Sequence, residues 1–487
     1  MDYIAKLKEM GAKNNFAYPV NDIGVAKLFY EFHSETNRYV SEAKSWYAFD
    51  GKRWLKDEGG ANTAELCKLF VQGYHSYFKI VCPEESNEPN DKAMLKFAAG
   101  LSSLKRRECV MKDARTIEPL NMAAFDRDPH VINLQNGAFD LRTMTLRPHR
   151  SADFITKLAR AYYDPKARCP RWERFISEIM CGDADMARYL QKALGYTLSG
   201  DMPEHVFFIL HGGTTRNGKS TLTETAAHIL GDYARTAQAQ TIAKRSSDGA
   251  AASPDLARLK GARLVNISEP EKGLELNAAL LKQLTGGDTY TARFLHENQF
   301  EFSPEFTIFI NTNHLPRVMD DTVFKSNRIK LIPFERHFEP HEQDSRLKSL
   351  FRKPQNMSGI LNWLVDGYRL YKTEGLSDTP ERVSAALEDY RRGNGIIDPI
   401  GEFIANTLIP CVGKVVKTSL LYDRYKPWSC ECGYNTVRIQ DFVSELRSRV
   451  TVRHDTSLGN IADGYALKSE HNAIHVSDVS HLSEAAV

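Results

Sequence analysis

The residues best equipped for chemistry form one glycine-rich loop, Gly213-Thr214-Thr215-Arg216-Asn217-Gly218-Lys219-Ser220. Its order fits G-x-x-x-x-G-K-[ST], the pattern of a phosphate-binding loop, at every fixed position. Glycines let backbone N–H groups converge on phosphate oxygens, the lysine reaches the β- and γ-phosphates, and the serine hydroxyl ligates Mg²⁺. The loop therefore predicts ATP and Mg²⁺ as cofactors, with ATP bound by Gly213 through Thr221 and the metal by Ser220.

Carboxylates follow the next apolar run, Leu264–Ile267, which continues into Ser268-Glu269-Pro270-Glu271. An acid at the carboxyl end of a neighbouring parallel strand can face Mg²⁺ or orient the attacking water. We expect Glu269 to be a catalytic acid and Glu271 to be a second candidate. Which of the two carries the larger role stays open, because Pro270 separates them.

Two further polar side chains lie at ends of apolar runs. Asn313 follows the run Phe306–Ile310, where an amide level with the γ-phosphate could hold the lytic water. The alternative is an ordinary turn, since asparagine and proline are both turn formers. Arg328 begins the run that continues through Phe334, and its planar fork suits a γ-phosphate in transition. A salt bridge at the start of a strand is the alternative for Arg328.

The elements that must position these side chains are short apolar strands separated by helical or polar segments. This alternation predicts an α/β core with a largely parallel sheet, in which Val206–Leu210 leads into the loop and Thr221–Leu230 leads out as a helix. Asp50-Gly51, between two aromatic runs, predicts a two-residue hairpin packed on its own core. The expected domains are a small mixed N-terminal domain of unclear role (1–105), a helical domain (106–200), the ATPase core (201–345), a helical lid and linker (346–397) and a winged-helix-like domain (398–487).

Composition places the chain among ordinary globular proteins. Of 487 residues, 42% are apolar and 26% are charged, and the net charge is +2. These values exclude a disordered chain and a histone-like polycation, so any nucleic-acid contact must be a local patch or pore. There is no signal-peptide pattern and no run of about 18 apolar residues, so we expect no membrane association. The eight cysteines show no regular spacing, and we interpret them as free thiols rather than as zinc ligands or disulfides.

Taken in order, the motifs resemble a known family. After the phosphate loop come Ser268-Glu269-Pro270-Glu271-Lys272-Gly273, Leu284-Thr285-Gly286-Gly287-Asp288, Thr312-Asn313-His314-Leu315-Pro316 and Arg328-Ile329-Lys330-Leu331. Upstream lie Asn136-Gly137-Ala138-Phe139-Asp140-Leu141 and Cys169-Pro170-Arg171-Trp172. The ordered set resembles the superfamily 3 helicases, specifically the poxvirus, phage and plasmid primase-helicase branch, over roughly residues 120–340.

The resemblance implies an AAA+ ATPase core that forms a hexameric ring, binds ATP between subunits and moves 3′ to 5′ on single-stranded DNA. By position, Lys219 and Ser220 bind phosphate and metal, and Glu269 is the acid of the second Walker motif and a magnesium ligand. Asn313 matches the sensor amide, and Arg328 matches the finger that reaches the neighbouring subunit's nucleotide.

The resemblance also implies a β-hairpin that points into the central pore, at residues 293–301. Within it, Arg293 and His296 are the candidate DNA contacts. About 105 residues precede the family-like region, too few for a primase domain of typical size. Asp126-Arg127-Asp128 is a D-x-D, but it stands in a loop without a polymerase context, so we do not expect primase activity in this chain.

The predicted function is that of an ATP-dependent replicative DNA helicase of a phage, prophage or plasmid. An AAA+ loader or initiator switch that does not unwind processively stays open as the alternative. The expected partners are single-stranded and forked DNA, further copies of the same chain, and a separate primase or polymerase. We expect a cytoplasmic location in a bacterial host cell.

Overall fold

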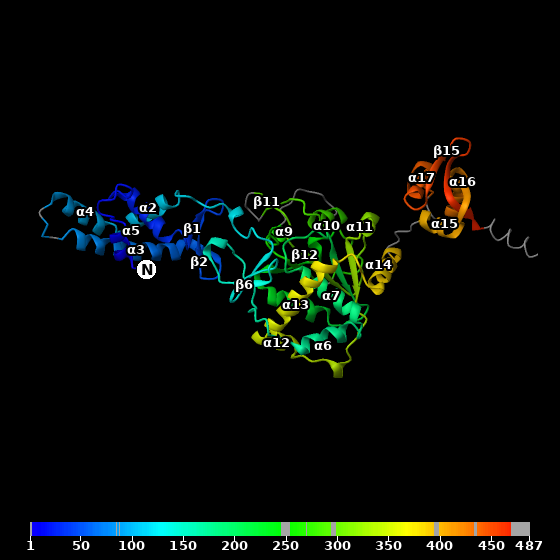
Figure 1. Ribbon diagram of the computed structural model, residues 1–487, viewed down its shortest axis with the longest axis horizontal. Coiled ribbons are helices and arrows are strands. Elements are labelled where there is room, and N and C mark those ends of the chain that lie inside the picture. The colour runs from blue at the N-terminus through cyan, green and yellow to red at the C-terminus, as the bar shows by residue number, and fades with distance from the viewer. Residues whose placement is uncertain are drawn as a thin grey trace, which may run out of the picture. The chain divides into compact units, whose positions relative to one another are not determined.

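A computed structural model describes residues 2–83, 85–86, 88–244, 254–268, 270–293, 299–393, 399–432 and 436–468 (Figure 1). The chain divides into two compact units, Met1–Asn394 and Gly395–Val487. The second unit has a hydrophobic core of its own, whereas the first unit contains several. No helix in the described part of the chain is long and apolar enough to cross a membrane. All eight cysteines are free.

The chain begins with helices packed around α3, next to a small antiparallel sheet. The elements are α1 (Tyr3–Glu9), α2 (Asp22–His33), β1 (Asn37–Val40), β2 (Ser45–Phe49), β3 (Trp54–Asp57), α3 (Ala61–Val81), α4 (Pro89–Gly100) and α5 (Leu104–Ala114). The expected domain boundary at residue 105 cuts through this core, because α5 buries Val110 and Ala114 in it.

The Asp50-Gly51 hairpin is present, but its loop is longer than predicted. Phe49 pairs with Trp54, so four residues connect β2 to β3 rather than two. The Asp50 carboxylate accepts hydrogen bonds from the backbone N–H groups of Lys52 and Arg53, both at 2.8 Å, and this side-chain turn replaces the tight turn we expected. Trp54 is buried beside Phe125, as expected of a hairpin on its own core.

The region before the central parallel sheet combines a three-stranded antiparallel sheet with two helices. These are β4 (Val131–Leu134), β5 (Gly137–Asp140), β6 (Thr145–Arg147), α6 (Pro170–Ile179) and α7 (Ala184–Tyr196). Both helices bury the apolar positions that their spacing predicts, including Trp172, Phe175, Tyr189 and Leu190. This region is therefore less purely helical than expected.

A five-stranded parallel sheet forms the centre of the first unit. Its elements are β7 (Phe207–His211), α8 (Lys219–Leu230), β8 (Ala234–Ala237), α9 (Pro254–Ala257), β9 (Leu264–Ile267), α10 (Ala278–Thr285), β12 (Thr307–Thr312), α11 (Asp321–Lys325) and β13 (Ile329–Pro333). The strand order is β13-β7-β12-β9-β8, and every pairing is parallel. This confirms the predicted α/β core of the P-loop type.

Strand β8 was not among the predicted strands. Its sequence, Ala234-Arg235-Thr236-Ala237, is short and only weakly apolar, so it gives no periodic signal. Its pairing with β9 at the edge of the sheet makes it a strand.

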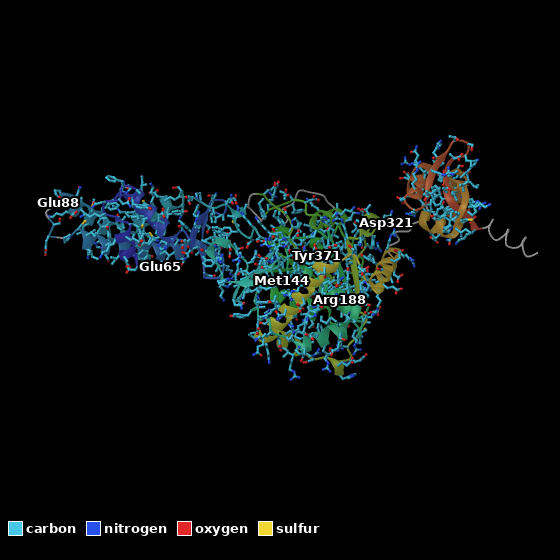
Figure 2. All side chains as sticks on the ribbon, in the orientation of Figure 1. Glu65, Glu88, Met144, Arg188, Asp321 and Tyr371 are labelled. Atoms are coloured by element: carbon cyan, nitrogen blue, oxygen red, sulfur yellow. The ribbon has the colours of Figure 1, made fainter. Side chains whose placement is uncertain are left out.

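Three helices follow the sheet: α12 (Leu347–Phe351), α13 (Pro354–Glu374) and α14 (Glu381–Gly393). Helix α13 packs closely on α7, because a Cβ on Gly195 would lie 2.2 Å from the Tyr368 nitrogen. Tyr371, labelled in Figure 2, belongs to α13. Its ring meets Tyr196 edge-on, with centroids 4.7 Å apart. Part of the segment expected to be lid and linker therefore belongs to the main hydrophobic core.

The second unit contains α15 (Pro399–Thr407), β14 (Leu408–Lys417), α16 (Thr418–Glu431), α17 (Ile439–Arg447), β15 (Val452–Asp455) and β16 (Gly459–Leu467). Its antiparallel sheet has the order β14-β16-β15. Phe403, Tyr425 and Phe442 fill the core between helices and sheet. Two helices followed by two strands is the order of elements that the sequence predicts, and β14 adds a strand ahead of them.

Candidate nucleotide-binding site

The glycine-rich loop connects β7 to α8, in the position the sequence predicts. Strand β7 lies between β13 and β12 and is parallel to both. Because the loop follows β7, it lies where all three strands have their carboxyl ends. Asn217 Nδ2 donates a hydrogen bond to the Thr214 carbonyl at 2.7 Å, and His337 Nδ1 donates to the Thr215 carbonyl at 2.9 Å. The loop is thus held by itself and by the segment after β13.

Two glycines in the connection between β7 and α8 are required by its packing. A Cβ on Gly212 would lie 2.1 Å from Asn217 Nδ2 and 2.8 Å from the Phe334 carbonyl oxygen. Gly218 has φ +86° and its Cβ would lie 2.4 Å from Ile179 Cγ2 on α6. Gly213, in contrast, has no atom within 4 Å of the Cβ position, so packing alone does not require glycine there. Space at this point suits the close approach of a phosphate to the backbone.

The start of α8 has the chemistry of an anion site. Its N-cap is Gly218, and no side chain caps the helix. The first-turn N–H groups of a helix have no partner within it, and they carry the positive end of its dipole. The Ser220 side chain, in this first turn, is exposed. These features fit a bound triphosphate with its magnesium ion at Ser220.

The structure brings Lys219 and Asn313 together. Lys219 is 3% exposed, and its Nζ donates a hydrogen bond to Asn313 Oδ1 at 2.7 Å. Asn313 directly follows β12, which pairs with β7 so that Thr312 lies opposite His211. Burial, and then the charge of Lys219, lower the pKa of His211, so this histidine is neutral at pH 7.

Of the two predicted acids, Glu269 lies outside the described residues. Glu271 is described, and its side chain is exposed. Its backbone carbonyl accepts a hydrogen bond from the Leu274 N–H at 3.1 Å. Among the described residues its carboxylate makes no hydrogen bond or ion pair, so the structure does not link Glu271 to Lys219 or Asn313. The roles of both acids stay predictions.

Arg328 lies at the amino-terminal end of the parallel strands, whereas the phosphate loop lies at their carboxyl end. Arg328 directly precedes β13, whose five residues pair in parallel with Phe207–His211. Strands rise about 3.3 Å per residue, so Arg328 and the end of β7 are separated by roughly 16 Å along the strand. Its Nη1 donates to the Thr285 hydroxyl at 2.9 Å and to the Lys282 carbonyl at 3.3 Å, at the end of α10. Arg328 is therefore remote from the phosphate loop of its own chain.

The predicted pore hairpin is present in part. β10 (Tyr290–Ala292) pairs antiparallel with β11 (Phe300–Phe302), which gives the two arms of a hairpin. Arg293 directly follows β10 and is half-buried. His296 lies outside the described residues. The predicted range of residues 293–301 therefore covers mainly the connection between the strands.

Sequence reasoning missed the buried polar side chains behind the loop. Asn266 on β9 and Asn311 on β12 are 7% and 5% exposed. Asn311 donates hydrogen bonds to Asn266 and to Thr223 of α8. A signal was available for Asn266, which interrupts the otherwise apolar β9, whereas Asn311 only follows the apolar residues of β12. A buried amide in such a strand needs hydrogen-bond partners, which points to a specific polar contact.

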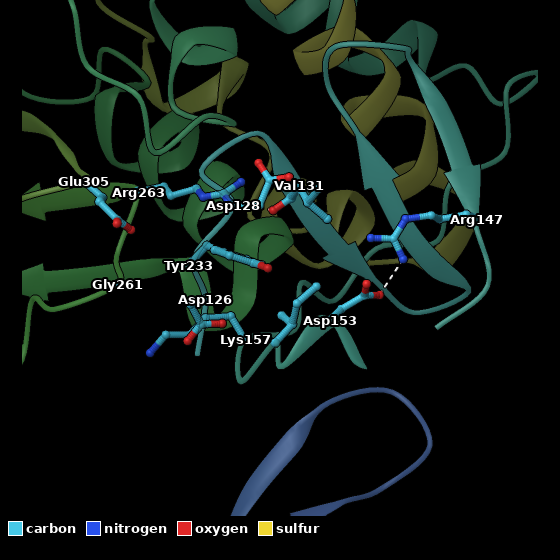
Figure 3. Close-up of a pocket in the computed structure, with 11 residues that line it drawn as sticks. Asp126, Asp128, Val131, Arg147, Asp153, Lys157, Tyr233, Gly261, Arg263 and Glu305 are labelled. Atoms are coloured by element: carbon cyan, nitrogen blue, oxygen red, sulfur yellow. Dashed lines mark hydrogen bonds and ion pairs between the residues drawn. The ribbon is translucent and has the colours of Figure 1, made fainter. Parts of the chain in front are cut away.

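A cavity of about 100 Å³ lies at the amino-terminal end of the parallel strands (Figure 3). Arg263 and Glu305, which line it, precede β9 and β12, so it is separate from the phosphate loop. Both acids of the D-x-D line it too, and both have structural partners. Asp126 accepts hydrogen bonds from the backbone N–H and the hydroxyl of Thr156, and Asp128 pairs with Arg142. This cavity gives no support for a polymerase site.

Two family models match parts of the chain. A model described as D5 N terminal like matches residues 26–181. A family of unknown function (DUF5906) matches residues 210–328. The second range includes the whole glycine-rich loop and extends to Arg328.

The curated relatives found are viral proteins named as helicases. "Putative helicase L207/L206" of Acanthamoeba polyphaga mimivirus is 26% identical over 83% of this chain. "Putative helicase 022R" of Frog virus 3 (isolate Goorha) is 22% identical over 69% of it. The chain covers 45% and 47% of these two proteins, so it spans about half the length of the curated relatives it matches.

Among solved structures, the apo A form of the NrS-1 C-terminal region matches with a TM-score of 0.48 and 11% identity, covering 91% of this chain and 99% of that chain. The D5-like match and the relatives named as helicases agree with the resemblance to the primase-helicase branch that the motifs carry. The chain is similar to viral proteins named as helicases, and its own fold is an α/β core of the P-loop type.

Proposed function

We propose that this chain is an ATP-dependent DNA helicase of superfamily 3 that works as a ring on single-stranded and forked DNA. The observation that carries the proposal is the paired Lys219 and Asn313 at the end of the phosphate loop, 2.7 Å apart. A triphosphate bound at such a loop requires a cation for its β- and γ-phosphates, which Lys219 would supply. The Asn313 amide beside it would orient the attacking water. Relatives named as helicases support DNA unwinding as the work done.

The position of Arg328 supports an active site shared between subunits. Because this arginine lies at the far edge of its own sheet, it cannot reach its own phosphate loop without large rearrangement of β13. It can serve as a finger only for nucleotide on another copy of the chain. A ring in which each amino-terminal sheet edge faces the next phosphate loop meets this requirement, and a hexamer is the ring size we propose.

ATP and Mg²⁺ are the proposed cofactors. The uncapped first turn of α8 and Lys219 would hold the phosphates, and Ser220 would ligate the metal together with Glu269. The bound metal would neutralise charge that develops on the phosphates during transfer. Within the chain, Asn313 and one of Glu269 and Glu271 would orient water, and Arg293 and His296 would contact DNA.

Strand displacement by the purified chain tests the proposal. ATP hydrolysis should rise on adding single-stranded DNA. A partial duplex with only a 3′ single-stranded tail should be unwound, and one with only a 5′ tail should not. Lys219→Ala is the control for a contaminating activity. If only the partial duplex with the 5′ tail is unwound, the proposed polarity is wrong, although the chain is still a helicase.

An AAA+ loader or initiator switch is the second candidate, since it would use the same nucleotide site. It would bind DNA and ATP and hydrolyse slowly, with no strand displacement at any protein concentration. The β10–β11 hairpin favours the helicase, because a switch needs no element that grips DNA in a pore. The replicon we propose is that of a phage, prophage or plasmid in a bacterial cytoplasm, with a separate primase or polymerase as partner.

A further inference from the structure

Three polar side chains connect the phosphate-loop helix to two strands of the sheet, and we call them the amide network: Thr223, Asn266 and Asn311. Asn311 Nδ2 donates one hydrogen bond to Asn266 Oδ1 at 2.6 Å and another to Thr223 Oγ1 at 2.9 Å. Both protons of this amide are used. The bond between Asn311 and Asn266 therefore couples β12 to β9, and the bond between Asn311 and Thr223 couples β12 to α8.

The amide network reaches the catalytic segment directly. The Thr223 hydroxyl donates its proton to the Lys219 carbonyl at 3.2 Å, in the first turn of α8. At the other end of the same region, Lys219 Nζ donates to Asn313, which follows Asn311 by two residues. Strand β12 and the start of α8 are thus connected twice, once through the sensor amide and once through the network behind it.

Stability does not account for the network. Asn311 Oδ1 is fully buried and has no hydrogen-bond partner among the described residues. A buried acceptor without a partner costs roughly 1–3 kcal/mol, while apolar side chains of the same shape at both positions can be neutral or stabilising. The neighbouring positions Leu264, Val265 and Ile310 are apolar and buried, so the sheet itself does not call for asparagine.

We propose that Thr223, Asn266 and Asn311 are positioning residues, which hold Lys219 and Asn313 at a fixed spacing during ATP hydrolysis. The inference rests on the proposed function and adds residues that touch neither nucleotide nor metal. A displacement of about 1 Å in a catalytic group can lower the rate roughly 10²-fold. The network supplies a second tether against such a displacement, because it fixes β12 to α8 behind the reacting groups.

The first test removes one hydroxyl. Thr223→Val keeps the β-branched shape inside α8 and breaks the bonds to Lys219 and Asn311, while Thr223→Ser keeps the hydroxyl. Thr225→Val is the matched control, since Thr225 is also buried on α8 and its hydroxyl bonds to no described residue. We expect Thr223→Val to lower kcat roughly 10- to 100-fold. KM for ATP and the Kd of a fluorescent ATP analogue should change by less than about threefold.

Thr223→Ser should recover most of kcat, and Thr225→Val should match the wild type. If Thr225→Val falls as far as Thr223→Val, or if Thr223→Ser does not recover, the effect is general packing and the inference is wrong.

The second test separates positioning from stability. The double variant Asn266→Leu with Asn311→Leu removes both amides and fills the same space. We expect Tm to be equal or higher and kcat to be low, which a merely structural role would not give. A lower Tm with an unchanged kcat per folded molecule would overturn the inference. A wild-type chain that binds and hydrolyses no ATP would refute the proposed function itself, whereas an active wild type with active Thr223→Val refutes only this inference.

Discussion

At the scale of single residues, Lys219 is the clearest prediction. Its side chain is buried at the start of α8 beside Asn313. Lys219→Ala should abolish ATP turnover, because the β- and γ-phosphates lose their cation. Steady-state hydrolysis at saturating ATP is the measurement, with circular dichroism to show that the variant folds. Turnover at the wild-type rate would mean that the loop does not bind the reacting phosphates.

The two acids are distinguished by paired amide variants. Glu269→Gln should keep ATP binding and lower hydrolysis by about 10²- to 10⁴-fold, the usual contribution of a general base. Glu271→Gln should have a mild effect, since its carboxylate is exposed and bonds to no described residue. Single-turnover hydrolysis with a binding measurement on each variant checks this. A severe Glu271→Gln with a mild Glu269→Gln would reverse the assignment.

Burial of Lys330 should make the free energy of unfolding depend on pH. Lys330 is 2% exposed on β13, and burial lowers the pKa of its ammonium to about 8. The unfolded chain holds this proton up to the ordinary lysine pKa, so folding is penalised below about pH 8 and the penalty is relieved as the pH rises above that value. Lys330→Met should therefore stabilise the protein near pH 7, by up to about 3 kcal/mol.

Denaturant unfolding of the Lys330→Met variant and the wild type, at about pH 7 and about pH 9.5, is the measurement. The gain should shrink at the higher pH, where the native lysine is mostly neutral. Lys372→Met on α13 serves as the control, because Lys372 is exposed. A gain that does not depend on pH would show that Lys330 is not held with a lowered pKa.

At the scale of elements, the β10–β11 hairpin should grip the DNA backbone. Arg293→Ala and His296→Ala should leave ATP hydrolysis in place and reduce unwinding. Each lost phosphate contact should lower the salt slope of single-strand binding by roughly 0.7. His296 is the weaker contact, since histidine is mostly neutral at pH 7 unless a phosphate raises its pKa. Normal unwinding and an unchanged salt slope in both variants would make the hairpin a structural element.

The elements also show how far sequence reasoning reaches. Strands β7, β9, β12 and β13 were predictable, because each is a short apolar run with a clear end. Their shared carboxyl edge follows from parallel pairing, and this brings Lys219 to Asn313. Strand β8 and the packing of α5 were not predictable, since both depend on contacts with residues far away in the sequence.

The amide network marks the same limit inside the site. Asn266 stands out in the sequence as a polar residue in an apolar strand, and Asn311 follows an apolar run, but nothing local indicates that the two side chains meet. Their contact depends on the register of β9 against β12 and on the position of α8 over both. Sequence spacing identifies residues that face ligand, whereas residues that act through others need the tertiary structure.

At the scale of the whole molecule, the sheet topology separates Arg328 from the loop of its own chain. Both flank the same pair of strands, β7 and β13, at opposite ends. Its present partners, Thr285 and the Lys282 carbonyl, hold the guanidinium at the end of α10. An isolated subunit should therefore bind ATP and hydrolyse it slowly, and assembly should raise the rate.

The central claim is that the active site is shared between subunits, and mixing two inactive variants tests it most directly. The Lys219→Ala variant keeps Arg328 but has an inactive phosphate loop. The Arg328→Ala variant keeps an active phosphate loop but lacks the arginine finger. Arginine fingers contribute about 10³- to 10⁵-fold where measured, so each variant alone should be nearly inactive. Arg328→Lys should also be inactive, because an ammonium lacks the planar fork. Mixed rings should regain part of the ATPase activity, because in some of them an intact Arg328 faces the intact phosphate loop of a neighbouring subunit. If native gels show that the variants mix while the mixture stays as inactive as each variant alone, Arg328 does not complete a neighbour's site and the shared active site is wrong for this protein.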